Sequence, residues 1–216
     1  MNTGADVAIV HVDAHCIVAD KPSGLLAVPG RGDAKQDCLS ERVRALHADA
    51  LIVHRLDMAT SGLMVMARGS LHQRQLSIAF AERQVHKRYE AVVDGHLAVP
   101  AESWAQIDLP LAADWPNRPL QQVDRLQGRP SLTRYRVLGP EGARQATRVE
   151  LEPVSGRSHQ LRVHLQAIGH PILGDTLYAP ANAQAAAPRL LLHATQLWLA
   201  HPRSGEALHF HSSAPF

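Results

Sequence analysis

Residues 51–68 read LIVHRLDMATSGLMVMAR, and a strand pattern adjoins a chemically unusual loop within them. The side-chain pattern of residues 62–68 alternates in the manner of a β-strand, so a strand is predicted there. The loop before them carries one carboxylate, Asp57, two residues after Arg55 and just before a Thr-Ser-Gly turn. A lone Asp in a loop is usually solvated or caps a turn. An ionised Asp also suits nucleophilic attack or proton abstraction at a sugar carbon without a cofactor. Asp57 is therefore the first candidate for a catalytic residue.

Outward from this stretch, strand patterns outnumber helix patterns and do not alternate strictly with them. Apolar alternation between turn residues predicts further strands at residues 7–13, 16–20, 88–95, 131–138, 146–152, within 190–202 and at 207–210. Helical spacing and end signals predict helices at residues 38–48, at 70–84 with Ser70 as N-cap, and at 158–168 before Gly169, with loops at 114–119 and 179–188. This order favours an α+β fold, in which one domain over residues 1–216 has a mixed, largely antiparallel β-sheet with flanking helices.

The composition points to a globular chain that uses arginine as its cation. The net charge is only +2, but 19 of the 22 basic residues are arginine, whose guanidinium fork suits phosphates and base edges. A GC-rich genome would produce the same bias. The sequence has no apolar run long enough to span a membrane and no basic segment leading into an apolar one at its start. We therefore expect a soluble, cytoplasmic protein that does not enter a membrane.

The cysteine and histidine content disfavours disulfides and metals. The chain has only two cysteines, Cys16 and Cys38. A disulfide framework is therefore not expected, and a cysteine-based zinc site is nearly excluded. The 14 histidines do not cluster with carboxylates or thiols at metal-ligand spacing. We expect no metal and no cofactor.

Two further segments can carry chemistry. In the strand predicted at 88–95, Tyr89 shares one face with Lys87 and could stack on a nucleobase, although a core tyrosine is the commoner case. In the helix predicted at 158–168, the spacing places Arg162 at the margin of the core, where a guanidinium requires an anionic partner. Arg157 and His159 stand at the start of that helix, where phosphate binding is favourable.

Taken in order, these segments resemble the RluA family of pseudouridine synthases. HRLD followed by TSG is similar to the catalytic-aspartate motif of the family, and KRYEAVV to its tyrosine motif. GRSHQLRVHLQAIGHPILGD is similar to its basic motif and LLLHA, residues 190–194, to its late motif. KPSG at residues 21–24 and DWPNRP at 114–119 also match, so the resemblance runs from about Ile17 to Phe210. It implies a pseudouridine synthase catalytic domain without an added S4 RNA-binding domain.

The resemblance implies a mechanism and roles for individual residues. The family breaks the C1′–N1 bond of uridine, rotates the base and rejoins it through C5, with no metal or redox cofactor. Asp57 would be the catalytic carboxylate, acting on C1′ or on the C2′ proton, and Arg162 its ion-pair partner. Tyr89 would stack on the base and assist proton transfer at C5. Leu192 would pack on the other side of the pocket, a choice left open among Leu190–Leu192. Arg55 would enter the space that the flipped base leaves.

The resemblance also implies the partner. The small member of the family that the additional matches resemble acts on two structured RNAs, a stem–loop of large-subunit (23S) ribosomal RNA and a tRNA anticodon stem–loop, whereas related members act on one RNA each. A compact monomer suits recognition of a short folded loop by shape. Phosphate contacts are expected from Arg118, Arg129 and Arg157, with His159 beside them.

Two other functions remain open on the sequence. An N-glycoside hydrolase would use Asp57 and stop after cleavage, but such enzymes usually need a second carboxylate near the first, and Glu90 would face away from Tyr89. A non-catalytic RNA-binding protein or RNA chaperone could use the same scaffold. Zinc-dependent base deamination is excluded because the H-x-E and P-C-x-x-C motifs are absent.

Overall fold

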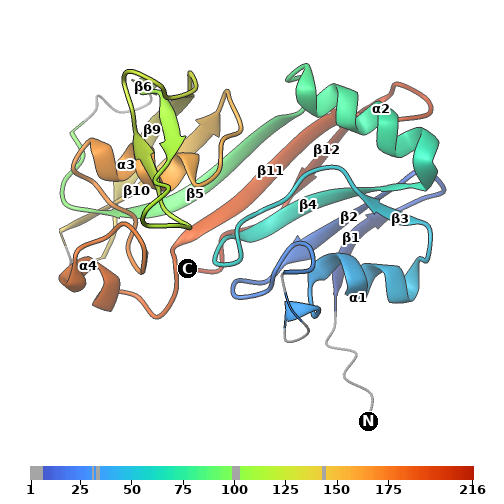
Figure 1. The fold of residues 1–216 in the computed structure, drawn as a ribbon, viewed down its shortest axis with the longest axis horizontal. Helices are drawn as coiled ribbons and strands as arrows, with labels where there is room; N and C mark the ends of the chain where they lie inside the picture. The colour runs from blue at the N-terminus through green and yellow to red at the C-terminus, as the bar shows by residue number, and fades with distance from the viewer. Residues whose placement is uncertain (1–6, 31, 33–34, 99–102, 143–144) are drawn as a thin grey trace, which may run out of the picture. The chain divides into compact units, whose positions relative to one another are not determined.

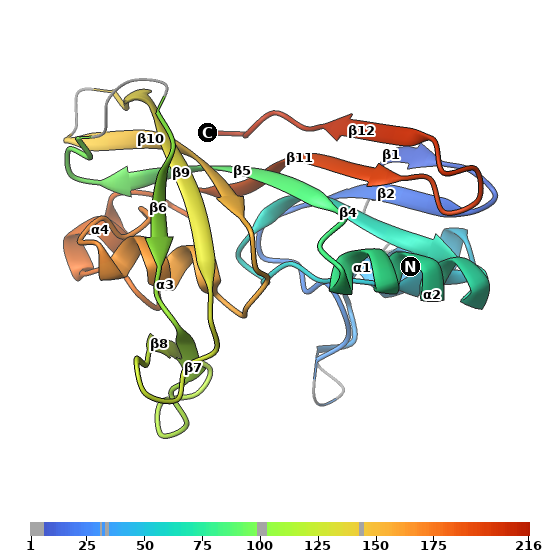
Figure 2. The same ribbon diagram turned by 90° about the horizontal axis from the view of Figure 1, so that it is seen from above.

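The structure is a computed structural model, in which the chain forms two compact units (Figures 1 and 2). It describes residues 7–30, 32, 35–98, 103–142 and 145–216. Unit 1 comprises residues 1–87 and 194–215, and unit 2 comprises residues 88–193 and Phe216. The chain passes from unit 1 to unit 2 near the start of strand β5 and returns near the start of strand β11.

Unit 1 is a largely antiparallel sheet with two helices on one face (Figure 2). Its sheet runs in the order β1-β2-β4-β11-β12, and β3 pairs with β4 as well. The elements are β1 (Ala8–Val12), β2 (Cys16–Lys21), α1 (Leu39–Leu46), β3 (Ala50–Ile52), β4 (Ser61–Arg68), α2 (Gly69–Ala81), β11 (Leu192–Ala200) and β12 (Ala207–His211). Strand β4 is buried on both faces up to Ala67, which fits its nearly continuous apolar sequence.

Unit 2 has a four-stranded antiparallel sheet in the order β5-β10-β9-β6. Its elements are β5 (His86–Asp94), β6 (Ala105–Asp108), β7 (Leu111–Ala113), β8 (Gln121–Val123), β9 (Leu132–Pro140), β10 (Ala146–Pro153), α3 (Gln160–Ala167) and α4 (Ala181–Ala185). Strands β7 and β8 pair with each other and form a small ribbon that extends away from the four-stranded sheet (Figure 2). One apolar cluster of this unit joins Val92 of β5 to Leu173 and Ala183.

The α+β class with a largely antiparallel sheet is confirmed, and the long strands lie where the sequence predicts them. The short strands β3, β6, β7 and β8 were not predicted, because three or four residues carry too little alternation. Ser70 is not the N-cap of α2, since that helix already begins at Gly69. The loop predicted at residues 179–188 contains helix α4. Helix α3 begins two residues later than predicted because His159 has a positive φ of 54°.

Candidate active site

The loop that carries Asp57 is held in place by the KPSG segment of unit 1. Lys21 is fully buried, and its ammonium donates hydrogen bonds to the carbonyl of Met58 at 3.1 Å and to two carbonyls of its own loop. The hydroxyl of Ser23 donates to the carbonyl of Ala59 at 2.7 Å. A buried ammonium is costly unless such acceptors surround it. The segment therefore fixes the two residues that follow the partly buried Asp57.

His54 anchors the other end of the same loop. Its Nε2 accepts the backbone N–H of Val65 at 3.0 Å, and its ring stacks on Phe80 with centroids 4.4 Å apart. Burial lowers the pKa of His54 to about 3, and the nearby ammonium of Lys87 adds to this effect. His54 is thus neutral, with its proton on Nδ1. Arg55, the next residue, is exposed, so the anchored side chain of His54 is followed directly by a guanidinium that reaches solvent.

Close packing of the Thr-Ser-Gly turn, residues 60–62, accounts for its small residues. Thr60 and Ser61 are buried, and Gly62 has a φ of +113°. A Cβ on Gly62 would lie 2.4 Å from the carbonyl oxygen of Ala194 on the neighbouring strand β11. Only glycine permits that close approach of two backbones. The exit of the Asp57 loop is therefore locked against the centre of the unit 1 sheet.

In unit 2, Arg162 forms a buried bidentate ion pair with Asp175. Its Nε and Nη2 donate to the two carboxylate oxygens at 2.7 and 2.6 Å, and both side chains are nearly inaccessible to solvent. The Oδ1 of Asp175 also accepts the backbone N–H groups of Leu177 and Tyr178. The prediction that a buried Arg162 needs an anionic partner is thus confirmed, with a partner that the sequence analysis did not name. The pairing of Arg162 with Asp57 stays a prediction.

Tyr178 links strand β8 to helix α3 and the residue before it within unit 2. Its Oη accepts the backbone N–H of Gln121 in β8 at 2.9 Å and lies 2.6 Å from Nδ1 of His159. Its ring lies 5.0 Å from the guanidinium carbon of Arg162. Because Oη accepts from Gln121, its own hydrogen is available to His159. Tyr178 therefore ties the start of α3 and Arg162 to the β7–β8 ribbon.

Helix α3 is fastened to the sheet by two buried polar side chains. Nε2 of His164 donates to the carbonyl of Leu109 at 3.0 Å, and its Nδ1 accepts from the hydroxyl of Thr133 at 2.9 Å. Burial lowers the pKa of His164, which keeps this ring neutral. The amide of Gln160 donates to the carbonyl of Leu132 and to Thr133. These bonds set the rotation of α3 and thereby direct Arg162 toward Asp175.

The remaining predicted residues lie in unit 2 with different exposure. Tyr89 in β5 is 8% exposed, and Leu192 at the start of β11 is 2% exposed, so both can line only an internal surface. Arg118 is exposed and stacks on the ring of Trp115, 4.7 Å from its centroid, while that ring is 70% exposed. Arg157 is partly buried. The roles of these residues stay predictions.

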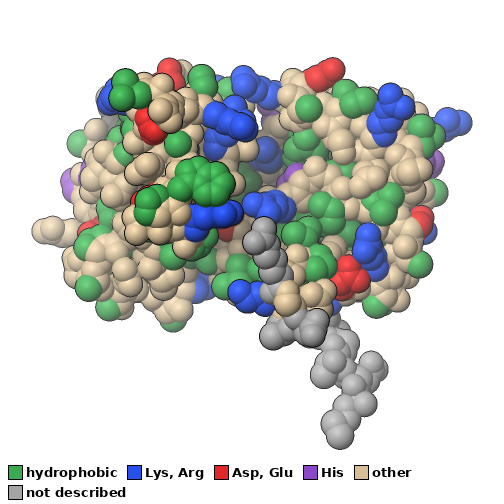
Figure 3. Space-filling model, viewed as in Figure 1, with side chains coloured by type: hydrophobic (Ala, Val, Ile, Leu, Met, Phe, Trp, Pro, Cys, Tyr) green, Lys and Arg blue, Asp and Glu red, His purple; other side chains and the backbone are tan. Residues whose placement is uncertain are grey.

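Charge and polarity on the surface agree with an anionic partner. Lys and Arg side chains gather on the face of the units seen in Figure 3, while Asp and Glu are scattered. At the four-stranded sheet of unit 2, the ring of Trp104 is surrounded by three guanidiniums, those of Arg88, Arg134 and Arg136. These three pair with Glu150 and Glu152, so the two carboxylates offset most of their positive charge. Arg55 and Arg118 of the predicted site are exposed, and the guanidinium of Arg118 lies over the ring of Trp115.

Sequence reasoning missed Asp175 and Tyr178, and it was wrong about histidine clustering. Asp175 closes the quoted basic motif, and the demand of a buried arginine for a carboxylate was the signal that could have selected it. The expectation that no histidine clusters with a carboxylate or thiol is contradicted at residues 11–16, where donors of His11, Asp13 and Cys16 lie within 4.8 Å of one another. The turn between β1 and β2 brings the three donor atoms together.

Comparison with known proteins shows the class of protein. Residues 15–167 match the family model of the RNA pseudouridylate synthases. The chain therefore belongs to this family and is an RNA-modifying isomerase. It is 47% identical over 210 residues to the dual-specificity RNA pseudouridine synthase RluA of Escherichia coli (strain K12), covering 97% of this chain and 94% of that protein. The RluA of Yersinia pestis is 48% identical, with 96% of this chain and 99% of that protein covered.

Solved structures give the same family. The human RNA pseudouridylate synthase domain containing 1 superposes with a TM-score of 0.81 and 28% identity, covering all of this chain and 86% of that one. The human domain containing 4 gives a TM-score of 0.74 and 29% identity over 96% of this chain and 88% of that one. No helix among the described residues is both long and apolar enough to cross a membrane.

Proposed function

We propose that this protein converts uridine to pseudouridine in two RNAs, a stem–loop of large-subunit ribosomal RNA and a tRNA anticodon stem–loop. The name of its bacterial relatives, dual-specificity RNA pseudouridine synthase, supports both substrates at 47% identity over nearly their whole length. The observation that carries the catalytic part is the loop of Asp57, which buried Lys21 and neutral His54 pin on both sides. A catalytic carboxylate needs such a rigid support.

In the proposed reaction, Asp57 acts on the ribose of the target uridine. It attacks C1′ or removes the C2′ proton, the C1′–N1 bond breaks, the base turns and C5 bonds to C1′. In the first case the bond between Asp57 and C1′ breaks as the C5–C1′ bond forms, and in the second Asp57 returns the proton to C2′. The proton on C5 then leaves and N1 regains one, so that substrate and product are isomers. We propose that Arg162 keeps Asp57 ionised, that Tyr89 stacks on the base and moves the C5 proton, and that Leu192 packs on its other face.

The RNA is held by groups that reach solvent. Extrusion of the target base costs a few kcal/mol, and we propose that the exposed Arg55 fills the space it leaves. Exposed Trp115, with Arg118 on its ring, offers a stacking platform, and stacking on an aromatic ring contributes roughly 1–3 kcal/mol per base. Arg157 and His159 are proposed phosphate contacts near the start of α3.

We propose further that the chain works as a cytoplasmic monomer, with residues 1–216 acting as one catalytic domain. The large share of each relative that it covers supports a domain of this extent. A non-catalytic RNA-binding protein or chaperone on the same scaffold is the second candidate, and exposed Trp115 would serve it equally well.

The test is pseudouridine formation in transcripts of the tRNA and of the large-subunit rRNA, mapped by carbodiimide adducts and primer extension. We expect product in both RNAs with the native chain and none with Asp57→Asn. Asp37→Asn, which changes an exposed carboxylate of the same unit, should retain activity. Product in one RNA only would remove the dual specificity. Release of free uracil would indicate a hydrolase, and tight binding without product would leave the binding protein.

A further inference from the structure

The turn between β1 and β2 in unit 1 is organised around the carboxylate of Asp13. Its Oδ1 accepts the backbone N–H groups of His15 at 2.6 Å and Cys16 at 2.8 Å. The backbone N–H of Asp13 in turn donates to the carbonyl of Cys16 at 3.1 Å. These three bonds close the turn and hold one carboxylate oxygen. The other oxygen, Oδ2, is directed away from the turn backbone.

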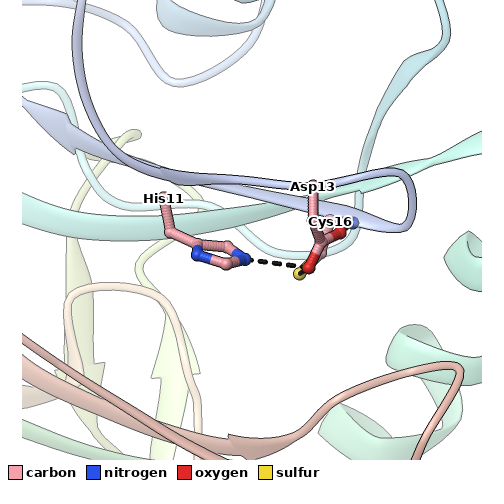
Figure 4. Close-up of side chains that lie close together, drawn as sticks. All are labelled: His11, Asp13 and Cys16. Carbon is pink, nitrogen blue, oxygen red and sulfur yellow. Dashed lines mark hydrogen bonds and ion pairs between the residues drawn. The ribbon is translucent and has the colours of Figure 1, made fainter.

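An imidazole nitrogen and a thiol sulfur converge on that second oxygen. Nε2 of His11 lies 2.9 Å from Oδ2 of Asp13, and Sγ of Cys16 lies 3.8 Å from it. The nitrogen, oxygen and sulfur atoms all lie within 4.8 Å of one another. Figure 4 shows the imidazole, carboxylate and thiol directed toward one point beside the hairpin. His11 and Asp13 reach it because residues two apart on a strand share a face.

We propose that His11 Nε2, Asp13 Oδ2 and Cys16 Sγ form a binding site for a divalent zinc-class cation. Imidazole, carboxylate and thiolate are the protein ligands of zinc, and bond lengths of about 2.0–2.3 Å in a tetrahedral site place the ligand atoms roughly 3.3–3.7 Å apart. The distance from His11 Nε2 to Asp13 Oδ2 is 2.9 Å, slightly below that range, and the distance from Cys16 Sγ to the same oxygen is 3.8 Å, slightly above it. With three protein ligands, solvent takes the fourth position.

The ion has an entry path, and the ligands change little on binding. The side chains of His11 and Asp13 are 30% and 29% exposed, whereas Cys16 is buried. When the cation binds, the ring proton of His11 moves from Nε2 to Nδ1, and the thiol proton of Cys16 leaves to solvent.

His201 supports the site from outside. Its Nδ1 accepts the backbone N–H groups of Arg203 and Ser204, so its Nε2 must carry the ring proton. That N–H donates to Oδ2 of Asp13 at 3.1 Å. A ligating carboxylate is commonly oriented by such a second hydrogen bond. His201 is therefore a positioning residue, and it connects the β1–β2 turn to the turn after β11.

The other possible trio, Asp13, His15 and His201, is less suited to a cation. Nδ1 of His15 lies 3.8 Å from Oδ1 of Asp13, and that oxygen is already occupied by two backbone N–H groups. His201 would have to give up its only ring proton while its Nδ1 still faces amide donors. The trio that contains Cys16 requires neither change.

Cobalt(II) as a zinc substitute tests the site directly, because thiolate ligation produces a near-ultraviolet charge-transfer band. The chain has only two cysteines, so the other buried one, Cys38, supplies the matched control. We expect one cobalt per chain, with a thiolate band that zinc abolishes. The band should survive in Cys38→Ser and disappear in Cys16→Ser. His11→Ala should weaken binding, and His201→Ala should lower affinity by about 10–100-fold while the band remains.

Folding of the variants is checked independently of the metal. Far-ultraviolet circular dichroism without metal, and pseudouridine formation in tRNA, should match the native chain for Cys16→Ser, since none of these residues belongs to the proposed RNA site. Absence of a thiolate band in the native chain would overturn the proposal. So would a band that persists in Cys16→Ser, or cobalt binding that depends on His15 instead of His11.

Discussion

Replacing Asp175 by asparagine tests how much the buried ion pair of unit 2 contributes to stability. The substitution keeps the shape of the side chain and removes its charge. Arg162 then loses a carboxylate that it contacts through two hydrogen bonds of 2.7 and 2.6 Å. Both side chains are at most 4% exposed, so water cannot replace the lost partner without opening the structure around α3.

The magnitude follows from this burial. Removal of one member of a buried ion pair typically costs about 3–5 kcal/mol, because a desolvated charge loses its compensation. That is a large part of the roughly 5–15 kcal/mol by which a domain is stable. We therefore expect Asp175→Asn to lower the free energy of unfolding by about 3–5 kcal/mol.

The chain contains a matched control with the same geometry at the surface. Asp37 in unit 1 accepts two hydrogen bonds of 2.7 Å from Nε and Nη2 of Arg42, but its side chain is 66% exposed. We expect Asp37→Asn to change stability little, because water solvates both charges when the pair is broken. Urea unfolding at pH 7, followed by far-ultraviolet circular dichroism, compares the variants. Equal losses for Asp175→Asn and Asp37→Asn would refute the reasoning from burial.

Three further predictions concern unit 1. His54 has a folded-state pKa of about 3, below the usual value of 6.5, so protons favour the unfolded chain. The contribution of neutral His54 to the free energy of unfolding is complete above pH 6.5 and is lost as the pH falls toward 3, by at most about 1.4 kcal/mol per pH unit. Urea unfolding over this range should show a smaller dependence on pH for His54→Gln than for the native chain. Gly62→Ala should prevent folding or lower the unfolding midpoint far more than Gly24→Ala, since a Cβ at Gly62 would lie 2.4 Å from the carbonyl oxygen of Ala194, whereas a Cβ at Gly24 would meet no atom within 4 Å. Lys21→Met should reduce kcat for pseudouridine formation more than it raises KM, because the loop of Asp57 loses its anchor; an unchanged kcat would contradict that role.

Prediction from sequence succeeded for elements long enough to show a period. Helix α3 presents a repeated apolar pattern, and burial of Leu161 and Leu165 follows from helical spacing. Strand β4 lies where it was predicted, but it is buried on both faces, so its run of apolar residues and not an alternation matches the structure. The period also placed Arg162 near the core, which implied an anionic partner before any partner was known. Short strands such as β7 carry no comparable signal, because they form through pairing with a neighbour and not through their own pattern.

The sequence by itself determined the class of fold, the family and the segments that carry chemistry, because these depend on local patterns and on short motifs of fixed spacing. Tertiary structure decided which side chains meet. Asp175 reaches Arg162 from thirteen positions away, and His201 reaches Asp13 across most of the chain. Such contacts depend on how loops turn and how strands pair, and these are set by packing and hydrogen bonding of distant residues. Positions in the sequence therefore predict the need for a partner, and only the folded chain supplies it.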